Sequence, residues 1–220
     1  MSEEKKKKRS NTQLDLDIAM EKDPAARNRF EVYFTYAGFI ALRKYRIAHW
    51  FYNHNMKGLA MFISASAKRR TGVDIHPAAK IAGGVFIDHG VGVVIGETAE
   101  IGTNVVMYQG VTLGGTGKET GKRHPTIEDN VMLSAGAKIL GSIRIGHDSK
   151  IGAGSVVLED VPPYCTVVGV PGRVVKQNDI RVNDLDQNLP DPVLEEFAKL
   201  HARISALEKL VIDSKKGKKE

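Results

Sequence analysis

An aliphatic residue recurs at every sixth position through the middle of the chain. The series runs Ile75, Ile81, Ile87, Ile95, Ile101, Met107, Leu113, Ile127, Leu133, Ile139, Ile145, Ile151 and Val157. Neither a helix nor an ordinary strand repeats with this period. Such a short repeat is typical of a parallel β-helix, in which stacked turns each place one aliphatic side chain per edge inside a narrow core. Three edges of six residues give a coil of eighteen, so the pattern predicts a prism of triangular section.

A second small or aliphatic residue follows four positions after most members of the series. These residues are Ala79, Val85, Val91, Ala99, Val105, Val111, Val131, Ala137, Ile143, Ser149 and Ser155, and we expect them where the interior tapers. The series is interrupted twice, because Ile87 to Ile95 spans eight positions and Leu113 to Ile127 spans fourteen. Insertions in a solenoid lie on its outside and commonly build the binding surface. The longer one is glycine-rich and ends in Arg-His-Pro, which makes it the first candidate for a site.

Both flanks of the repeat are predicted to be helical. Residues 11–71 carry apolar positions at spacings of three and four and should cover the first coil as an N-terminal helical domain. We expect Asp23-Pro24 to start a helix there, with one apolar face continuing through Phe51. Residues 176–213 should form a linker and a C-terminal helix whose apolar seam contacts other copies in a trimer or packs on its own chain; the seam is Val193, Phe197, Leu200, Ile204, Leu207 and Val211.

Composition limits the remaining possibilities. A chain of 220 residues with 42% hydrophobic content can bury one β-helix core, expected over 72–175, and a smaller flanking domain. Most of the net charge of +6 lies in two lysine-rich tails, 1–10 and 214–220, which we expect to be disordered. Basic patches interleaved with aromatic residues are absent, which argues against nucleic-acid binding. A single cysteine, no signal peptide and no long apolar stretch predict a cytoplasmic protein that does not enter a membrane.

Asp74 and His89 form the first candidate catalytic pair. They lie fifteen residues apart, close to one coil, so neighbouring coils are expected to bring them together. A carboxylate beside an imidazole fixes its tautomer and stabilises the imidazolium, which is how many enzymes build a general base. Taken alone, a histidine in a turn is more often an ordinary surface residue.

Longer motifs give the pair its context. The segments Asp74-Ile75-His76-Pro77, Asp88-His89-Gly90-Val91-Gly92, Gly114-Gly115-Thr116-Gly117-Lys118, Arg123-His124-Pro125 and Gly169-Val170-Pro171-Gly172-Arg173 resemble the serine O-acetyltransferase family. The similarity covers about residues 23–173. It implies a left-handed parallel β-helix of hexapeptide repeats, with active sites between adjacent subunits of a homotrimer. Because the helical region is short, we expect a trimer rather than the hexamer of longer members.

The resemblance also implies residue roles. His89 resembles the base that takes the proton of the serine hydroxyl, and Asp74 resembles its partner. Asp23 and Asp88 match carboxylates that hold the substrate ammonium, while Arg123 matches the cation that binds its carboxylate, a task suited to a planar guanidinium. His124 resembles a second histidine that contacts the substrate. Acetyl-CoA is the implied co-substrate, without a metal, and is expected near Gly115, Ala135, Gly136, Lys150, Ala153 and Gly154.

Three alternatives remain open at this point. A trimeric zinc enzyme of the β-helix type is one, with nitrogen ligands drawn from His76, His89, His124 and His147. Another hexapeptide acyltransferase, with an acceptor such as homoserine, is the second, since one methylene changes binding by only about 1 to 3 kcal/mol. The third is a complex with O-acetylserine sulfhydrylase, which is doubtful because the chain ends in Glu220 rather than the usual isoleucine.

Overall fold

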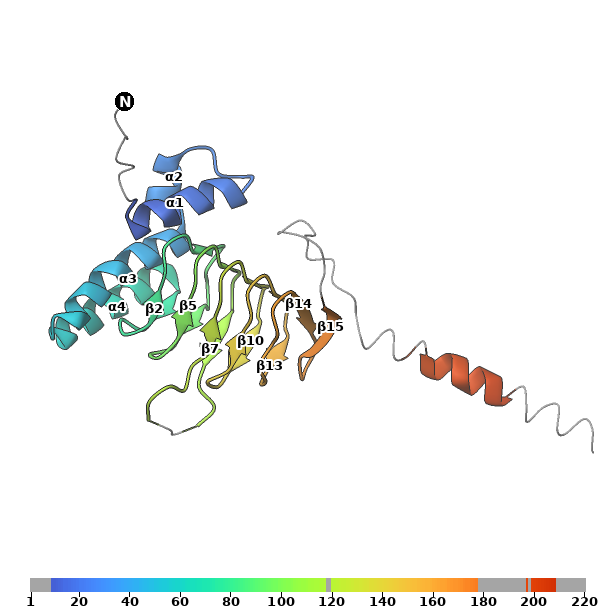
Figure 1. Cartoon of the computed structure of the whole chain (residues 1–220). Helices are drawn as coiled ribbons and strands as arrows, with labels where there is room; N and C mark the ends of the chain where they lie inside the picture. The colour runs from blue at the N-terminus through green and yellow to red at the C-terminus, as the bar shows by residue number, and fades with distance from the viewer. Residues whose placement is uncertain (1–8, 118–119, 178–196, 198, 209–220) are drawn as a thin grey trace, which may run out of the picture.

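The computed structural model describes residues 9–117, 120–177, 197 and 199–208. Within them, four helices come first: α1 (Asn11–Lys22), α2 (Arg29–Thr35), α3 (Ala37–Asn53) and α4 (Lys57–Thr71). Fifteen short strands then stack along one axis, and the loop after β7 projects from the stack (Figure 1). No helix among the described residues is long and apolar enough to cross a bilayer.

From β1 to β13 the chain visits three sheets in rotation, strand by strand, and β14 and β15 both join the third sheet. Sheet 1 contains β1 (Asp74–Ile75), β4 (Val94–Ile95), β7 (Thr112–Gly114), β10 (Lys138–Leu140) and β13 (Val156–Val157). Sheet 2 contains β2 (Lys80–Ile81), β5 (Glu100–Ile101), β8 (Thr126–Ile127) and β11 (Arg144–Ile145). Sheet 3 contains β3 (Phe86–Ile87), β6 (Val106–Met107), β9 (Met132–Leu133), β12 (Lys150–Ile151), β14 (Cys165–Val168) and β15 (Arg173–Gln177).

The register of these strands confirms the predicted coil length. Every pair is parallel except β14 with β15. Lys138 lies opposite Val156, eighteen residues later. Asp74 lies opposite Val94, twenty residues later, because the turn after β3 holds two extra residues. Pairs that span the long loop are 26 residues apart, so both insertions leave the stack without shifting its register.

Burial confirms the sixfold series as the core, since all thirteen of its residues are at most 7% exposed. The second series is also confined to the interior or its border, with one exception. Val91 is 66% exposed, so our prediction for it was wrong. The two extra residues before β4 move the inward position to Val93, which is 0% exposed.

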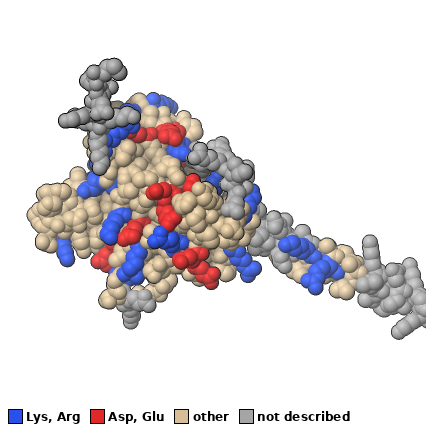
Figure 2. Space-filling view, viewed as in Figure 1, with Lys and Arg blue, Asp and Glu red and all other residues tan. Residues whose placement is uncertain are grey.

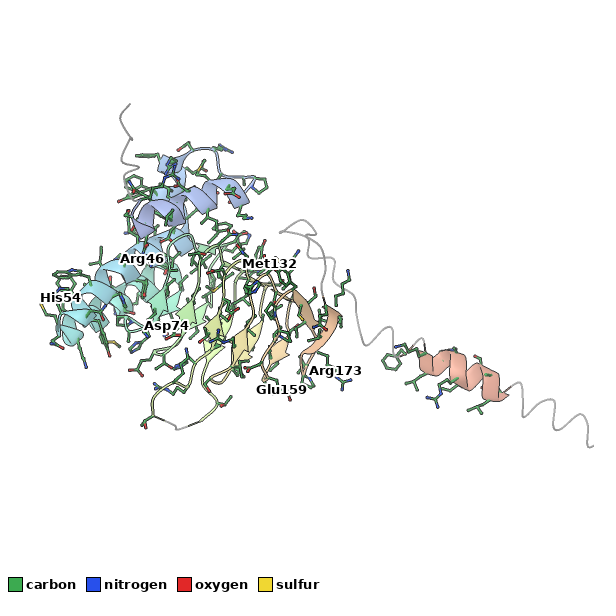
Figure 3. The ribbon with its side chains drawn as sticks, viewed as in Figure 1. Arg46, His54, Asp74, Met132, Glu159 and Arg173 are labelled. Carbon is green, nitrogen blue, oxygen red and sulfur yellow. The ribbon has the colours of Figure 1, made fainter. Side chains whose placement is uncertain are left out.

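The helices cover the first coil and the outer face of sheet 3. Ala41, Leu42 and Tyr45 of α3 belong to the same buried cluster as the strand interior. On sheet 3, Phe86 and Met132 point outward and pack against α1, α2 and α3 (Met132 is labelled in Figure 3). The outward-facing residues of sheet 3 are apolar because the helices bury them.

The other two outer faces differ in character. Sheet 2 is charged: Lys80 pairs with Glu100 at 3.0 Å and Arg144 pairs with Glu128. Figure 2 shows basic and acidic side chains intermingled on the face of the molecule that Figure 1 presents. On sheet 1, α4 packs against β1, and exposed aliphatic residues lie on the sheet and beside it: Val91, Val94, Leu158 and Val170.

A buried ion pair fastens α1 to the first coil. Arg46 of α3 contacts the carboxylate of Asp15 at 2.9 Å, and the side chain of Asp15 is 1% exposed. Asp15 Oδ1 also accepts the backbone N–H groups of Gly84 and Val85 at 2.9 and 3.0 Å. Arg46, labelled in Figure 3, also donates to the carbonyls of Ile81 and Ala82, at the end of β2. Because Asp23 caps the end of α1, this anchor also helps to fix Asp23.

Two local predictions about the helices were wrong. Asp23 ends α1 instead of starting a helix, and α2 begins only at Arg29, where the Asn28 side chain caps it. The apolar run is also not one face, because the chain breaks at Tyr36 between α2 and α3. Phe30, on α2, is 74% exposed as a result.

Much of the predicted C-terminal region lies outside the described residues, including Val193 and Val211 of the seam. Residues 197 and 199–208 are helical, and the four described seam residues are 45–67% exposed in the single chain. At the other end, the described residue Ser10 caps α1 through its hydroxyl, which accepts from Gln13 N.

Candidate active site

The turns that lead from sheet 3 to sheet 1 form one edge of the stack, which we call the 3–1 edge. Asp88 and His89 occupy its first turn, directly after β3. His89 has a φ of 57°, a left-handed conformation that is uncommon for residues other than glycine, although asparagine, aspartate and histidine adopt it more often than the rest. Its imidazole is 73% exposed, and Nε2 lies 3.8 Å from Asp88 Oδ1. The turn therefore presents a histidine to solvent beside a carboxylate.

Asp23 joins this edge from the end of α1. The Tyr36 hydroxyl donates to Asp23 Oδ2 at 2.6 Å. Burial raises the pKa of the Asp88 carboxyl above its ordinary value, and the nearby charge of Asp23 raises it further, while His89 opposes the shift. Two carboxylates close enough to repel each other form a site that a bound cation would stabilise.

A column of residues with little or no side chain continues down the 3–1 edge from His89. Gly92, Gly110, Gly136 and Gly154 stack in successive coils with backbone hydrogen bonds between the turns. Four of the residues predicted near acetyl-CoA, Ala135, Gly136, Ala153 and Gly154, belong to this column. Lys150 lies on β12 in sheet 3, and Gly115 lies on a different edge.

The turns from sheet 1 to sheet 2 form the 1–2 edge, which carries Arg123 and His124. The Arg123 guanidinium contacts Glu97 Oε2 at 2.5 Å. This hydrogen bond holds the pKa of the Glu97 carboxyl below its ordinary value. Arg123 is thus paired and oriented in the free chain.

Thr98 fixes the return of the long loop and the tautomer of His124. Its hydroxyl oxygen accepts the backbone N–H groups of Arg123 and His124 at 3.0 and 3.1 Å. The backbone N–H of Thr98 lies 3.2 Å from His124 Nδ1, which must therefore be an acceptor. Burial lowers the pKa of His124, as does the charge of Arg123. The ring is held neutral with its proton on Nε2.

The sequence analysis gave no place in the candidate acetyltransferase site to three residues of this edge: His76, which it named only as a possible zinc ligand, and Glu97 and Thr98. The His76 ring accepts the backbone N–H of Ala78 at Nδ1, 3.1 Å away, and burial lowers its pKa. A usable signal existed for the other two. Glu97 and Thr98 precede Arg123 and His124 by 26 residues, which equals one coil plus the extra eight residues of the long loop.

Asp74 lies in β1, beside α4 (Figure 3). Its Oδ2 accepts Lys68 Nζ at 2.7 Å. It stands opposite Val94, and His89 lies in the turn that enters the strand of Val94. In the part of the chain that the structure describes, no hydrogen bond or ion pair joins Asp74 to His89.

The candidate residues therefore gather in two sets rather than one. Asp23, Asp88 and His89 lie on the 3–1 edge, whereas Arg123 and His124 lie on the 1–2 edge, and sheet 1 separates the two edges. Among the described residues, no group of three or more His, Cys, Asp or Glu side chains is arranged to hold a metal ion.

Comparison with known proteins gives the context of these two sets. A family model described as bacterial transferase hexapeptide (six repeats) matches residues 124–159. A serine acetyltransferase of Bacillus subtilis (strain 168) is 56% identical over 203 residues, 91% of this chain and 94% of its own. The crystal structure of Neisseria gonorrhoeae serine acetyltransferase in complex with serine is 48% identical, with a TM-score of 0.74 over 76% of this chain and 68% of that one.

A further solved structure carries the other relevant ligand. Serine acetyltransferase from Brucella abortus strain S19, in complex with coenzyme A, is 43% identical, with a TM-score of 0.74 over 77% of this chain and 68% of that one. The alignment with the B. subtilis protein covers nearly the whole of both chains and is not confined to the hexapeptide repeats. The chain therefore belongs to the serine acetyltransferase family of hexapeptide-repeat transferases.

Proposed function

We propose that this protein transfers the acetyl group of acetyl-CoA to the hydroxyl of L-serine, giving O-acetyl-L-serine and CoA, the first step of cysteine synthesis from serine. The observation that carries the proposal is that the two edges of sheet 1 present different binding groups. One edge offers two carboxylates and a histidine, and the other offers an arginine and a neutral imidazole. Serine is a zwitterion, so its ammonium requires the carboxylates and its carboxylate requires the arginine.

The two edges meet if three copies of the chain surround a threefold axis. Of the three outer faces, sheet 3 is covered by helices and sheet 2 is charged, which leaves sheet 1 with exposed aliphatic residues to face the axis. In such a trimer, the 3–1 edge of one copy adjoins the 1–2 edge of the next. The proposal includes closure of the three sheets into a left-handed β-helix over 72–175, flanked by a helical domain over 11–71.

Substrate binding then divides between two subunits. Asp23 and Asp88 bind the ammonium of serine, which relieves their mutual repulsion. Arg123 of the adjoining copy binds the carboxylate with its planar guanidinium. Glu97 holds that guanidinium in place while its remaining N–H groups stay available. His124 donates from Nε2 to the substrate, because Thr98 occupies Nδ1.

Acetyl transfer is direct. His89 accepts the proton of the serine hydroxyl as the oxygen attacks the thioester carbonyl, and the imidazolium then protonates the departing CoA thiolate. Asp74 orients His89: Lys68 engages its Oδ2, which leaves Oδ1 for the imidazole N–H. Backbone N–H groups near Gly115, in the glycine-rich loop, donate to the oxyanion of the tetrahedral intermediate.

Acetyl-CoA lies along the groove between adjacent copies. The column that includes Ala135, Gly136, Ala153 and Gly154 leads to His89 and lets an extended chain approach the backbone. Lys150, on β12 of sheet 3, binds the anionic end of the cofactor in this proposal. The reaction needs no metal, and a single buried cysteine, Cys165, supports a cytoplasmic location.

The test incubates the protein with acetyl-CoA and each of a panel of acceptors. The measured quantity is the rate at which the CoA thiol is released. We expect L-serine to be the best acceptor, ahead of L-homoserine, and no turnover with N-acetylserine, which lacks the ammonium. Size-exclusion chromatography with light scattering should give the mass of a trimer. Equal turnover with N-acetylserine would reject the two-carboxylate site, and stoichiometric zinc in the purified protein would favour a metalloenzyme.

A further inference from the structure

Tyr36 connects the junction between α2 and α3 to the end of α1. It is the last residue before α3, and its hydroxyl bonds to Asp23 Oδ2 at 2.6 Å across thirteen residues of sequence. Neither the repeat pattern nor the family motifs identify Tyr36. The bond joins it to a residue proposed to bind substrate.

Asp23 needs such a partner because it lies in an irregular segment. It follows α1, and the next helix starts only at Arg29. Its Oδ1 accepts the backbone N–H of Ala25 at 2.8 Å, a local turn that fixes one oxygen. Tyr36 fixes the other. Each carboxylate oxygen has two lone pairs, so both can still accept from an ammonium group.

Tyr36 is itself held against the strand that carries the second carboxylate. Its ring packs on a buried cluster that includes Phe86, Val106 and Met132 on sheet 3. Phe86 is in β3, two residues before Asp88. One tyrosine therefore links Asp23 to the scaffold under Asp88.

The Tyr36 hydroxyl is a lasting donor. Burial raises the pKa of Tyr36 to about 12, and the hydrogen bond to Asp23 and the charge of Asp88 act in the same direction. At neutral pH the Tyr36 phenol keeps its proton, so its hydrogen bond to Asp23 persists.

We propose that Tyr36 is a positioning residue that holds the Asp23 carboxylate in the orientation required to bind the ammonium group of the amino-acid substrate. The inference rests on the proposed function and extends it to a residue that does not touch the substrate. A carboxylate fixed before binding loses less conformational freedom when the ammonium arrives, so affinity rises without a new contact.

The test compares Tyr36→Phe with Tyr33→Phe. Tyr33 lies one turn earlier on α2 and packs in the same cluster, but its hydroxyl has no hydrogen bond within the described part of the chain. We expect Tyr36→Phe to raise the KM for L-serine by about tenfold, the order of one hydrogen bond to a charged group. Its kcat and its KM for acetyl-CoA should stay near wild type, and Tyr33→Phe should change none of the three.

A double-mutant cycle with Asp23→Ala separates positioning from general damage. If Tyr36 acts through Asp23, adding Tyr36→Phe to Asp23→Ala should raise the KM for serine no further. If Tyr36→Phe melts at a lower temperature than the wild type, titration calorimetry at a temperature where both proteins are folded should be used. It gives the dissociation constant for L-serine, which replaces KM in the comparison.

The outcomes are distinguishable. An active wild type with an unchanged serine KM in Tyr36→Phe, or an equal rise in both backgrounds, overturns the role of Tyr36 and leaves the proposed function standing. A wild type that does not acetylate serine rejects the proposed function and this inference together.

Discussion

Replacing Gly96 with alanine tests whether the position of the His124 ring limits catalysis. Gly96 follows β4 on the 1–2 edge, and a Cβ built there would lie 2.0 Å from Cδ2 and 2.1 Å from Nε2 of His124. Non-bonded carbons rest about 3.5–4.0 Å apart, so relief requires a displacement of more than about 1 Å. The ring has little freedom to yield, because Thr98 holds its Nδ1 and the residue is 8% exposed.

We expect Gly96→Ala to lower kcat/KM for acetyl transfer to L-serine by about 100-fold, since misplacing a functional group by 1 Å can have that effect. Overpacking should also reduce the free energy of unfolding by about 1–3 kcal/mol. Initial rates of thiol release measure the first quantity, and a denaturant titration measures the second.

Two other glycines provide matched controls. A Cβ at Gly102 would lie 2.4 Å from Asp129 Oδ1, a similar clash in a turn between sheets 2 and 3. A Cβ at Gly58, on α4, would meet nothing within 4 Å. Gly102→Ala should lose stability yet keep a kcat/KM near wild type, and Gly58→Ala should keep both. Wild-type kcat/KM in Gly96→Ala, or an equal loss in Gly102→Ala, would refute the reasoning.

Four further changes probe other parts of the structure. His89→Asn should lower kcat by about 10² to 10⁴-fold in the thiol-release assay, with unchanged melting, as expected for loss of a general base. Arg123→Lys keeps the charge but loses the planar fork, so steady-state kinetics should give a serine KM about tenfold higher. Leu133→Ala, at a core position with 0% exposure, should cost about 2 to 5 kcal/mol of unfolding free energy in a urea titration. Burial holds the pKa of His124 below its ordinary value of 6.5, so the unfolded chain binds the proton more readily than the folded chain. The free energy of unfolding should therefore fall as the pH drops from 6.5 through the lowered pKa. Melting curves of His124→Asn should show a smaller decline over the same pH range.

The strand stack was predictable from the sequence because its period directly determines burial. The residues of the sixfold series fill the core and are all apolar, so Ile75 and its successors can be recognised from the sequence. Val91 was misplaced because the length of an insertion is visible in the sequence while the position of the extra residues within the turn is not. The break at Tyr36 was missed because the apolar run continues through it, although α2 ends at Thr35 and α3 begins at Ala37.

The candidate site was predictable only in part. Family motifs supplied its residues, and the coil length was sufficient to pair Glu97 and Thr98 with Arg123 and His124. No spacing within one chain indicates that the 3–1 and 1–2 edges belong to one site, because in the proposed trimer that contact is made between copies. The partner of Asp23 was equally hidden, since Tyr36 reaches it through the packing of α2 and α3 on sheet 3.

The long loop has a physical consequence for how Arg123 and His124 are held. It leaves after β7 and returns to β8 with the register of the stack intact, since Glu100 still lies opposite Thr126. A loop of that length would leave its last residues loosely placed if only the strand fixed them. Thr98 removes this freedom, because its hydroxyl accepts two successive N–H groups at the return and its carbonyl accepts Lys122 Nζ at 2.8 Å. Arg123 and His124 are therefore positioned by the coil below them, so the rest of the loop can differ in sequence without moving them.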